Sequence, residues 1–467
     1  MEAAMPISPE KGTCPNVNRI KEFRTHHPLR MSLINLIRRT DAMRYYYDFI
    51  NSQWYSHEHI QEIQFQNLKR LLTHAYNNVP YYRRTFNAHG LQVENIKDFI
   101  DFKKVPYLDK NIIKTNYADM FASNMKQFKP HPKSTGGSTG NPLLFYIDKK
   151  AHSMQWAYIY RAWNIGGWTP GEKVVVIGGT SLFSKTTAIR KWAYATINNW
   201  ILFSAFDMSD DNMAAWVVKI RKFKARYMYT YANSVYVFAD YIERKAINDI
   251  TFDAIFTTSE VLTDKIRKKA EQVFSCKVYD EYGGSDGAGF AFECEMQKLH
   301  VVLENCVFEI TNEDSSTLAP GEEGEICTTD LFNYGMPFIR YKTGDISSFS
   351  ESPCSCGRGL PLLTNIKGRV SDYCTNKDGE RVNYTFFDHM FKTHDWIHQF
   401  YVVQESHSKI TIYFKTTKEY PLKELNSIRA MIQQKFSGFE VNIKMTNETP
   451  KTISGKHKYV INKTLEP

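Results

Sequence analysis

The sequence predicts a layered α/β fold that is followed by a smaller α+β unit. The first observation is the alternation of apolar strands and helices between residues 173 and 282. Strands without a polar face are buried on both sides, as in a parallel sheet covered by helices. The second observation is a change of pattern near the C-terminus, where Ile410, Ile412 and Phe414 alternate in a half-buried strand.

The expected elements follow from local signals. Residues 1–18 resemble a loose tail, and residues 30–90 are expected to form helices, one ending near Asn78 because the residue before Pro80 avoids the α region. Asp109 is suited to cap a short helix. The layered region is expected to contain strands at 173–177, 227–231, 253–257 and 277–282, with helices at 151–167, 209–223, 233–246 and 263–274. Later come antiparallel strands at 301–310 and 324–329, a helix at 422–435 and a strand at 441–445.

Composition narrows the class of protein. The 467 residues are 42% hydrophobic and 14% aromatic, which is typical of a globular chain with more than one domain. No run of about 18 apolar residues predicts a membrane span, and the N-terminus does not resemble a secretory signal, so a cytoplasmic location is expected. The net charge of +9 suits anionic ligands such as ATP or coenzyme A. The basic residues are dispersed, so nucleic acid is not expected as a partner.

A loop rich in glycine and hydroxyl side chains spans residues 133–142 and leads into a strand containing Phe145 and Ile147. Glycine permits close approach of the backbone, and hydroxyl and backbone N–H groups donate hydrogen bonds to an anion. The loop therefore suits a polyphosphate, although it lacks the Walker pattern, and a flexible surface loop is the alternative. The candidate residues are Ser134, Thr135, Gly136, Gly137, Ser138, Thr139 and Gly140.

Further candidates follow the ends of strands, where ligands bind in parallel sheets. Tyr282 could stack on an adenine, and the glycines after it allow close approach. Asp286 could bind a magnesium ion that bridges phosphates, or it could cap a tight turn. The set at these strand ends is Ser259, Glu260, Tyr282, Gly283, Gly284, Ser285 and Asp286.

Two later segments carry charge. Asp345 follows Thr-Gly at a strand end and could accept both ribose hydroxyls, with Arg340 and Lys342 supplying positive charge nearby. A charged hairpin turn is the alternative. Lys456 follows a Ser-Gly turn and could stabilise the charge that develops in phosphoryl or acyl transfer, although lysines near C-termini are usually solvated.

Together these motifs resemble a known family. The order Ser-Thr-Gly-Gly-Ser-Thr-Gly, Thr-Ser-Glu, Tyr-Gly-Gly-Ser-Asp, Arg-Tyr-Lys-Thr-Gly-Asp, Gly-Arg and Pro-Lys-Thr-x-Ser-Gly-Lys is similar to that of the adenylate-forming acyl-coenzyme A synthetases. The segments His74–Tyr82 and Val105–Lys110 resemble the phenylacetate–coenzyme A ligase branch, and within it the CapK-like capsular polysaccharide proteins. The resemblance spans roughly residues 55–460.

The resemblance implies an N-terminal adenylation domain over 19–367 and a mobile C-terminal lid over 368–467. It implies that residues 134–140 hold the ATP phosphates and that Ser259 and Glu260 lie against the adenine opposite Tyr282. It also implies roles for three further residues. Asp345 would bind the ribose, Arg369 would contact ribose or phosphate, and Lys456 would be the catalytic lysine of adenylation.

Two positions depart from the family pattern. Asp286 stands where the family usually has the glutamate that binds magnesium. The hinge aspartate of Gly-Arg-x-Asp-Asp is replaced in Gly368-Arg-Val-Ser-Asp372, so either Ser371 or Asp372 serves as the hinge. The family chemistry is attack of a carboxylate on the ATP α-phosphate, release of pyrophosphate, and transfer of the acyl group to coenzyme A, another thiol or an amine.

The eight cysteines indicate a metal site rather than disulfides, because the chain is large and has no secretory signal. Cys294, His300, Cys354 and Cys356 could form a closed Cys₃His zinc site, which is structural because it leaves no position for water. Some relatives in the branch carry a structural zinc there, and buried free thiols are the alternative. Cys276, Cys306, Cys327 and Cys374 are expected to be core or surface thiols.

The sequence leaves the acceptor open between coenzyme A, a carrier thiol and an amine in surface polysaccharide synthesis. A catalytically silent adenylation-like binding module is a further alternative, against which the presence of both Asp345 and Lys456 argues. The acid and the oligomeric state are not indicated.

Overall fold

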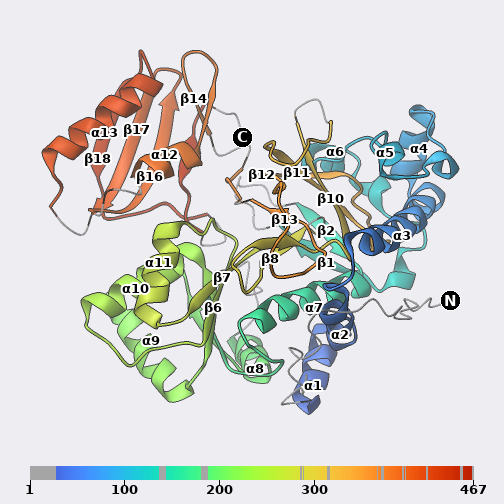
Figure 1. Ribbon diagram of the computed structural model, residues 1–467, viewed down its shortest axis with the longest axis horizontal. Helices are drawn as coiled ribbons and strands as arrows, with labels where there is room; N and C mark the ends of the chain where they lie inside the picture. Colours follow the sequence, from blue (N-terminus) through green and yellow to red (C-terminus); the bar gives the residue numbers. More distant parts are fainter. Residues whose placement is uncertain are drawn as a thin grey trace.

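A computed structural model gives the fold of the chain (Figure 1). It describes residues 28–135, 143–179, 188–283, 287, 289–312, 316–364, 366–369, 373–391, 394, 396–416, 419–452 and 456–464. None of the helices in these ranges is long and apolar enough to cross a membrane.

Helices form the first part of the fold, as predicted. They are α1 (Pro28–Arg38), α2 (Ala42–Ser52), α3 (His57–Asn78), α4 (Pro80–Ala88), α5 (Phe99–Phe102) and α6 (Lys110–Thr115), with 3₁₀ turns at Val93–Asn95, Tyr117–Met120 and Met125–Phe128. Helix α3 ends at Asn78 because Val79, before Pro80, is extended. Asp109 caps α6 by accepting the Ile112 N–H at 2.7 Å.

An eight-stranded sheet forms the centre of the large N-terminal domain. Its strand order is β13-β9-β8-β7-β6-β5-β3-β4, and the strands from β4 to β7 are parallel. The parallel strands are β3 (Val174–Gly178), β4 (Trp200–Ser204), β5 (Tyr227–Tyr231), β6 (Ala254–Thr258) and β7 (Lys277–Gly283). The antiparallel strands are β8 (Phe290–Glu293), β9 (Leu299–Val301) and β13 (Leu362–Leu363). The predicted parallel strands are confirmed, and β4 was missed.

Helices cover both faces of this sheet (Figure 1). Helices α7 (Lys149–Ile165) and α8 (Ala188–Asn198) lie on one face, and α9 (Asp210–Phe223), α10 (Ala232–Arg244) and α11 (Asp264–Phe274) lie on the other. The ring of Trp163 on α7 stacks on Phe256 of β6, with 5.7 Å between centroids. Gly166 allows this approach, because a Cβ there would lie 2.7 Å from the Cβ of Ala254.

Smaller sheets adjoin the large one. β1 (His131–Ser134) pairs with β2 (Leu144–Ile147), and β10 (Cys306–Thr311), β11 (Gly324–Asp330) and β12 (Tyr341–Ser347) form an antiparallel sheet. The prediction of a single strand over 301–310 is wrong. Val301 ends β9 in the eight-stranded sheet, whereas Cys306 begins β10 in another sheet. The chain turns between them, where the Glu304 carboxylate forms a buried ion pair with Arg161 of α7 at 2.5 Å.

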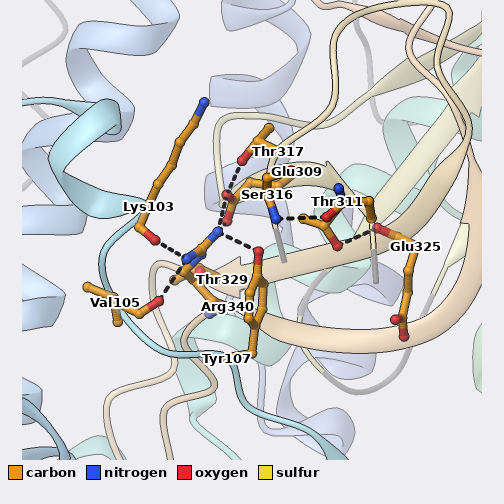
Figure 2. Close-up of polar contacts among 11 residues, drawn as sticks. Lys103, Val105, Tyr107, Glu309, Thr311, Ser316, Thr317, Glu325, Thr329 and Arg340 are labelled. Carbon is orange, nitrogen blue, oxygen red and sulfur yellow. Dashed lines mark hydrogen bonds and ion pairs between the residues drawn. The ribbon is translucent and has the colours of Figure 1, made fainter. Parts of the chain in front are cut away.

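Arg340 does not supply charge to the candidate ligand segment, contrary to the prediction. Its guanidinium is buried and pairs with both carboxylate oxygens of Glu309, at 3.0 and 2.9 Å (Figure 2). It also donates to the backbone carbonyls of Lys103 and Val105 and to the hydroxyl of Tyr107. Arg340 therefore joins the 103–107 segment to the β10–β12 sheet.

A four-stranded sheet forms the small C-terminal domain, with the order β18-β17-β16-β19. Its elements are β14 (Tyr373–Thr375), β15 (Arg381–Asn383), α12 (Tyr384–Phe391), β16 (Ile397–Ser406), β17 (Lys409–Thr416), α13 (Leu422–Lys435), β18 (Glu440–Met445) and β19 (Val460–Asn462). Its aromatic and aliphatic core is separate from the two cores of the large domain. The predicted α/β fold with a large N-terminal and a small C-terminal domain is confirmed, as are the helix at 422–435 and the strand at 441–445.

Candidate functional site

A cavity of about 170 Å³ lies where the two domains meet, at the ends of β6 and β7. It brings together residues that are far apart in the sequence. The predicted site residues in its wall are Ser259, Glu260, Tyr282, Gly283, Asp345, Arg369 and Lys456. The carboxyl ends of parallel strands thus form one side of the cavity, as in other open α/β sheets.

Asp345 is held by two side chains in this cavity. The Tyr282 hydroxyl donates to Asp345 Oδ2 at 2.9 Å, and Arg369 Nε donates to Asp345 Oδ1 at 3.1 Å. Burial first and the Asp345 charge second raise the pKa of Tyr282 well above its usual value, so the phenol stays protonated and can donate. Gly344 precedes Asp345 with φ of +83°, a conformation that favours glycine.

Glu260 connects the two domains. It follows Ser259, which adopts a left-handed φ of +71° at the end of β6. Glu260 Oε2 accepts the Asn233 N–H at the start of α10 at 2.7 Å, and Oε1 accepts the His457 N–H of the C-terminal domain, also at 2.7 Å. Burial raises the pKa of Glu260 while these two N–H groups oppose the rise. One buried carboxylate therefore bridges the domains beside Lys456.

The segment that carries Lys456 is fixed against both domains. The Lys456 N–H donates to Thr452 Oγ1 at 3.1 Å, and Lys451 and His457 form an isolated antiparallel bridge. Lys451 Nζ reaches the large domain, where it donates to the carbonyls of Ala205 at 2.6 Å and Phe206 at 3.0 Å. The positive charge of Lys456 lowers the pKa of Glu260. The Lys456 ammonium group therefore lies within electrostatic reach of the Glu260 carboxylate.

The glycine-rich loop begins at a hairpin between β1 and β2. Ser134 pairs with Leu144, and Thr135 Oγ1 accepts the Leu143 N–H at 2.9 Å. Several other predicted residues lie outside the described residues, so their roles stay predictions. They are Gly136, Gly137, Ser138, Thr139, Gly140, Gly284, Ser285, Asp286, Ser371 and Asp372.

The predicted metal ligands converge near β8, β9 and β13, at one edge of the eight-stranded sheet. One ligand atom from each of Cys294, His300, Cys354 and Cys356 lies within 4.8 Å of all the others. The Cys294 and Cys354 sulfurs are 3.7 Å apart, and His300 Nε2 is 3.3 Å from the Cys356 sulfur. His300 Nδ1 lies 2.8 Å from the Leu360 carbonyl, so this nitrogen carries the proton and Nε2 faces the thiols.

The alternative of unrelated free thiols does not explain why three cysteines and one histidine converge. Cys306, Cys327 and Cys374 are buried individually, and Cys276 is partly exposed. The pKa of Cys356 is lowered, first by a hydrogen bond from Cys294 and then by His300, while the pKa of Cys294 is raised.

Sequence reasoning missed three residues in the cavity wall. His457 is buried behind Lys456, and Asp280 and Glu281 lie on β7 just before Tyr282. The sequence offered a signal for the last two, because two adjacent acidic residues within a predicted buried strand need a partner or a function.

Comparison with known proteins identifies relatives of the chain. Residues 374–463 match the family model of the CapK C-terminal domain. Protein CapK of Staphylococcus aureus is 24% identical over 407 residues, covering 86% of this chain and 89% of CapK. The chain is thus similar to CapK over most of its length. Phenylacetate–coenzyme A ligase of Escherichia coli (strain K12) is 29% identical, covering 68% of this chain and 72% of the ligase.

Solved structures show the same fold at lower identity. 2-Hydroxyisobutyryl-CoA ligase in the postadenylation state, in complex with R3-HIB-AMP, has a TM-score of 0.69 at 18% identity, covering 86% of this chain and 90% of the ligase. The same ligase in the thioesterification state has a TM-score of 0.55. The resemblance to acyl-coenzyme A ligases of the adenylate-forming type and to CapK is confirmed.

Proposed function

We propose that the protein activates a carboxylic acid with ATP, releases pyrophosphate, and passes the acyl group to a thiol such as coenzyme A. One observation carries this proposal. Lys456, Asp345, Arg369 and Tyr282 come from four separate segments and line one cavity between the domains. The relatives support it, because several are named phenylacetate–coenzyme A ligase and the structural neighbours include acid–AMP complexes.

The adenylation step uses the groups that face this cavity. An oxygen of the acid attacks the α-phosphorus, and the bond from that phosphorus to the bridging oxygen of the pyrophosphate breaks. Lys456 supplies positive charge where the transition state gains negative charge. Asp345 accepts the ribose hydroxyls with its orientation fixed by Tyr282 and Arg369. These contacts orient the nucleotide before reaction, which lowers the entropic cost of the step.

The nucleotide has further proposed contacts. Ser259 and Glu260 lie against the adenine edge, and residues 134–140 hold the β- and γ-phosphates. Asp286 would hold a magnesium ion, which would neutralise part of the negative charge of the phosphates. Thr135 supports the loop by closing its stem onto Leu143.

The thiol step requires the lid to move. We place the domain boundary at 367/368, with the hinge at Ser371 or Asp372. Rotation there would remove His457 from Glu260 and withdraw Lys456 from the cavity. The adenylate would then face the thiol, whose sulfur attacks the acyl carbon and displaces AMP.

Zinc is proposed as a structural ion at Cys294, His300, Cys354 and Cys356. In a tetrahedral site with Zn–S bonds of about 2.3 Å, two sulfurs lie about 3.8 Å apart. The 3.7 Å between Cys294 and Cys354 fits this spacing without rearrangement. All four positions are filled by protein ligands, so the ion would support the fold and would not activate water.

The test is pyrophosphate release with ATP and magnesium against a panel of carboxylic acids, with hydroxylamine to trap the adenylate. Release that depends on one acid, followed by thioester formation when coenzyme A is added, is the expected result. Tight ATP binding with no release from any acid would instead indicate the silent binding module.

A further inference from the structure

Glu281 is a buried carboxyl group without a hydrogen-bonding partner. It lies on β7 between Asp280 and Tyr282, in the wall of the cavity between the domains. Its side chain is 3% exposed, and among the residues that the structure describes neither carboxyl oxygen has a partner that meets the geometry of a hydrogen bond. A buried polar group that is left unpaired is costly, so such a group in a cavity wall needs an explanation.

Other buried carboxylates in this domain are paired. Glu304 binds Arg161, Glu309 binds Arg340, and Glu293 binds Arg267 at 2.6 Å. Asp280, the neighbour of Glu281, accepts the Thr257 hydroxyl at 2.7 Å. The unpaired state of Glu281 is therefore not a general property of acidic residues in this core.

The surroundings of Glu281 are aromatic. In the sheet it lies opposite Thr258 of β6 and Phe292 of β8. Its carboxylate contributes, after burial, to the raised pKa of Tyr229 on β5, so that ring lies within electrostatic reach. The indole of Trp163 on α7 faces it, but the indole N–H also has no partner in hydrogen-bonding geometry.

Burial, and then Asp280, raise the pKa of Glu281 well above its usual value, and the indole N–H of Trp163 opposes the rise only in part. Without a ligand, burial therefore favours the neutral form of this carboxyl group. A positive charge placed beside it would restore the carboxylate and supply the missing partner.

We propose that Glu281 selects the substrate, and that the acid activated by this protein carries an ammonium group that pairs with the Glu281 carboxylate. This inference rests on the proposed function, because it names the substrate class of the same site. The acid is therefore of the amino-acid type, with its amine directed toward β7 and its carboxylate toward Lys456.

An ammonium group fits the chemistry better than a neutral group. It carries a positive charge and offers three donors to the two oxygens of Glu281. An acid with only apolar substituents would leave the Glu281 oxygens buried and unpaired in the complex. The same residue thus favours the amine and disfavours the matching neutral acid.

The experiment measures pyrophosphate release with acids paired by carbon skeleton: β-alanine with propanoate, γ-aminobutyrate with butyrate, and phenylglycine with phenylacetate. For at least one pair, kcat/KM should be about tenfold or more higher for the aminated member. In Glu281→Gln, kcat/KM for that member should fall about 100-fold through KM, with the KM for ATP unchanged. Glu281→Asp, which keeps the charge, should lose less.

Glu243→Gln is the matched control, because it removes one negative charge from an exposed position on α10. It should leave the preference unchanged. Preference for neutral acids in the wild-type protein, or an unchanged amine preference in a folded Glu281→Gln variant, would overturn the inference while the proposed function stands. Absence of release with every acid would overturn the proposed function, and the inference with it.

Discussion

The Tyr282 hydroxyl and the Asp345 carboxylate are 2.9 Å apart, although Tyr282 belongs to the eight-stranded sheet and Asp345 to the three-stranded one. This hydrogen bond joins the two sheets at the floor of the cavity. It gives Tyr282 a function besides stacking on a base, since the residue also sets the orientation of the group proposed to bind the ribose.

Tyr282→Phe should therefore weaken ATP binding while keeping the ring. Loss of the donor leaves Asp345 held by Arg369 alone, and we expect the KM for ATP to rise about tenfold, equivalent to about 1.4 kcal/mol. Steady-state pyrophosphate release measures this value. Tyr401→Phe, in the C-terminal sheet and outside the cavity wall, is the control and should leave it unchanged. An unaltered KM in Tyr282→Phe would show that Asp345 does not need this donor.

Lys456→Ala should abolish the first half-reaction selectively. We expect adenylate formation to fall at least about 1000-fold, because a charge aligned with the developing negative charge is lost. Thioester formation from a supplied acyl-adenylate should remain within about threefold of the wild type. Lys463→Ala, which removes a lysine after β19, serves as the control. Equal losses in both half-reactions would contradict the role given to Lys456.

Glu260→Ala should shift the balance between the two domain arrangements. It removes the acceptor of the His457 N–H, so the arrangement with Lys456 in the cavity becomes less populated. The expected result is a fall of about tenfold in the adenylation rate with little change in the thioester step. Small-angle X-ray scattering should show a larger radius of gyration for the variant. A variant with normal rates and scattering would mean that Glu260 does not hold the lid.

Zinc removal should destabilise the large domain. Metal analysis of the purified protein should find about one zinc per chain, and Cys356→Ser should lose it and lower the Tm by several degrees. Cys276→Ser is the matched control, because Cys276 lies outside the cluster, and it should keep the metal. Purified protein without metal, together with an unchanged Tm for Cys356→Ser, would exclude the site.

The stability of the C-terminal domain should decrease as the pH falls from about 6.5 to about 4. Burial lowers the pKa of His457 to about 4 from its usual 6.5, although the hydrogen bond to the Phe400 carbonyl opposes this shift; the charges of Lys451 and Lys415 add to the lowering. Between these values the unfolded chain binds a proton that the folded chain does not. Stability is thus complete above about pH 6.5 and declines by up to about 3 kcal/mol at about pH 4. Urea unfolding at several pH values should show a shallower decline in His457→Gln, and an equal slope in both proteins would contradict this assignment.

The sequence predicted the parallel part of the sheet well. Strands β3, β5 and β6 are buried on both faces, and short apolar runs of this kind that alternate with helices indicate a parallel sheet. It also predicted that Cys294 and Cys354 lie close together, because a Cys₃His site can form only if the two cysteine-containing segments meet. The order of the motifs singled out Asp345, Arg369 and Lys456 as candidates, and the structure brings all three to one cavity, although no local pattern predicts that they meet.

Arg340 shows what the sequence could not supply. A guanidinium beside a proposed ligand segment suggests phosphate binding, but the decisive partners are carbonyls at residues 103 and 105, more than two hundred positions away. Glu281 was missed for a related reason. Whether an acidic residue in a strand is paired depends on neighbouring strands, and only the folded sheet reveals that Glu281 has no partner.

The cysteine and histidine cluster also has a topological consequence. Cys294 follows β8 and Cys356 precedes β13. Between them the chain adds β9 to the large sheet, leaves it to build β10, β11 and β12, and returns to pair β13 with β9. A metal bound there would close this excursion into a ring, with Asp345 carried inside it. Opening the ring would lengthen the free loop in the unfolded chain and increase its entropy. The fidelity with which the strand that carries Asp345 re-forms after unfolding would then depend on an ion bound at a different edge of the domain.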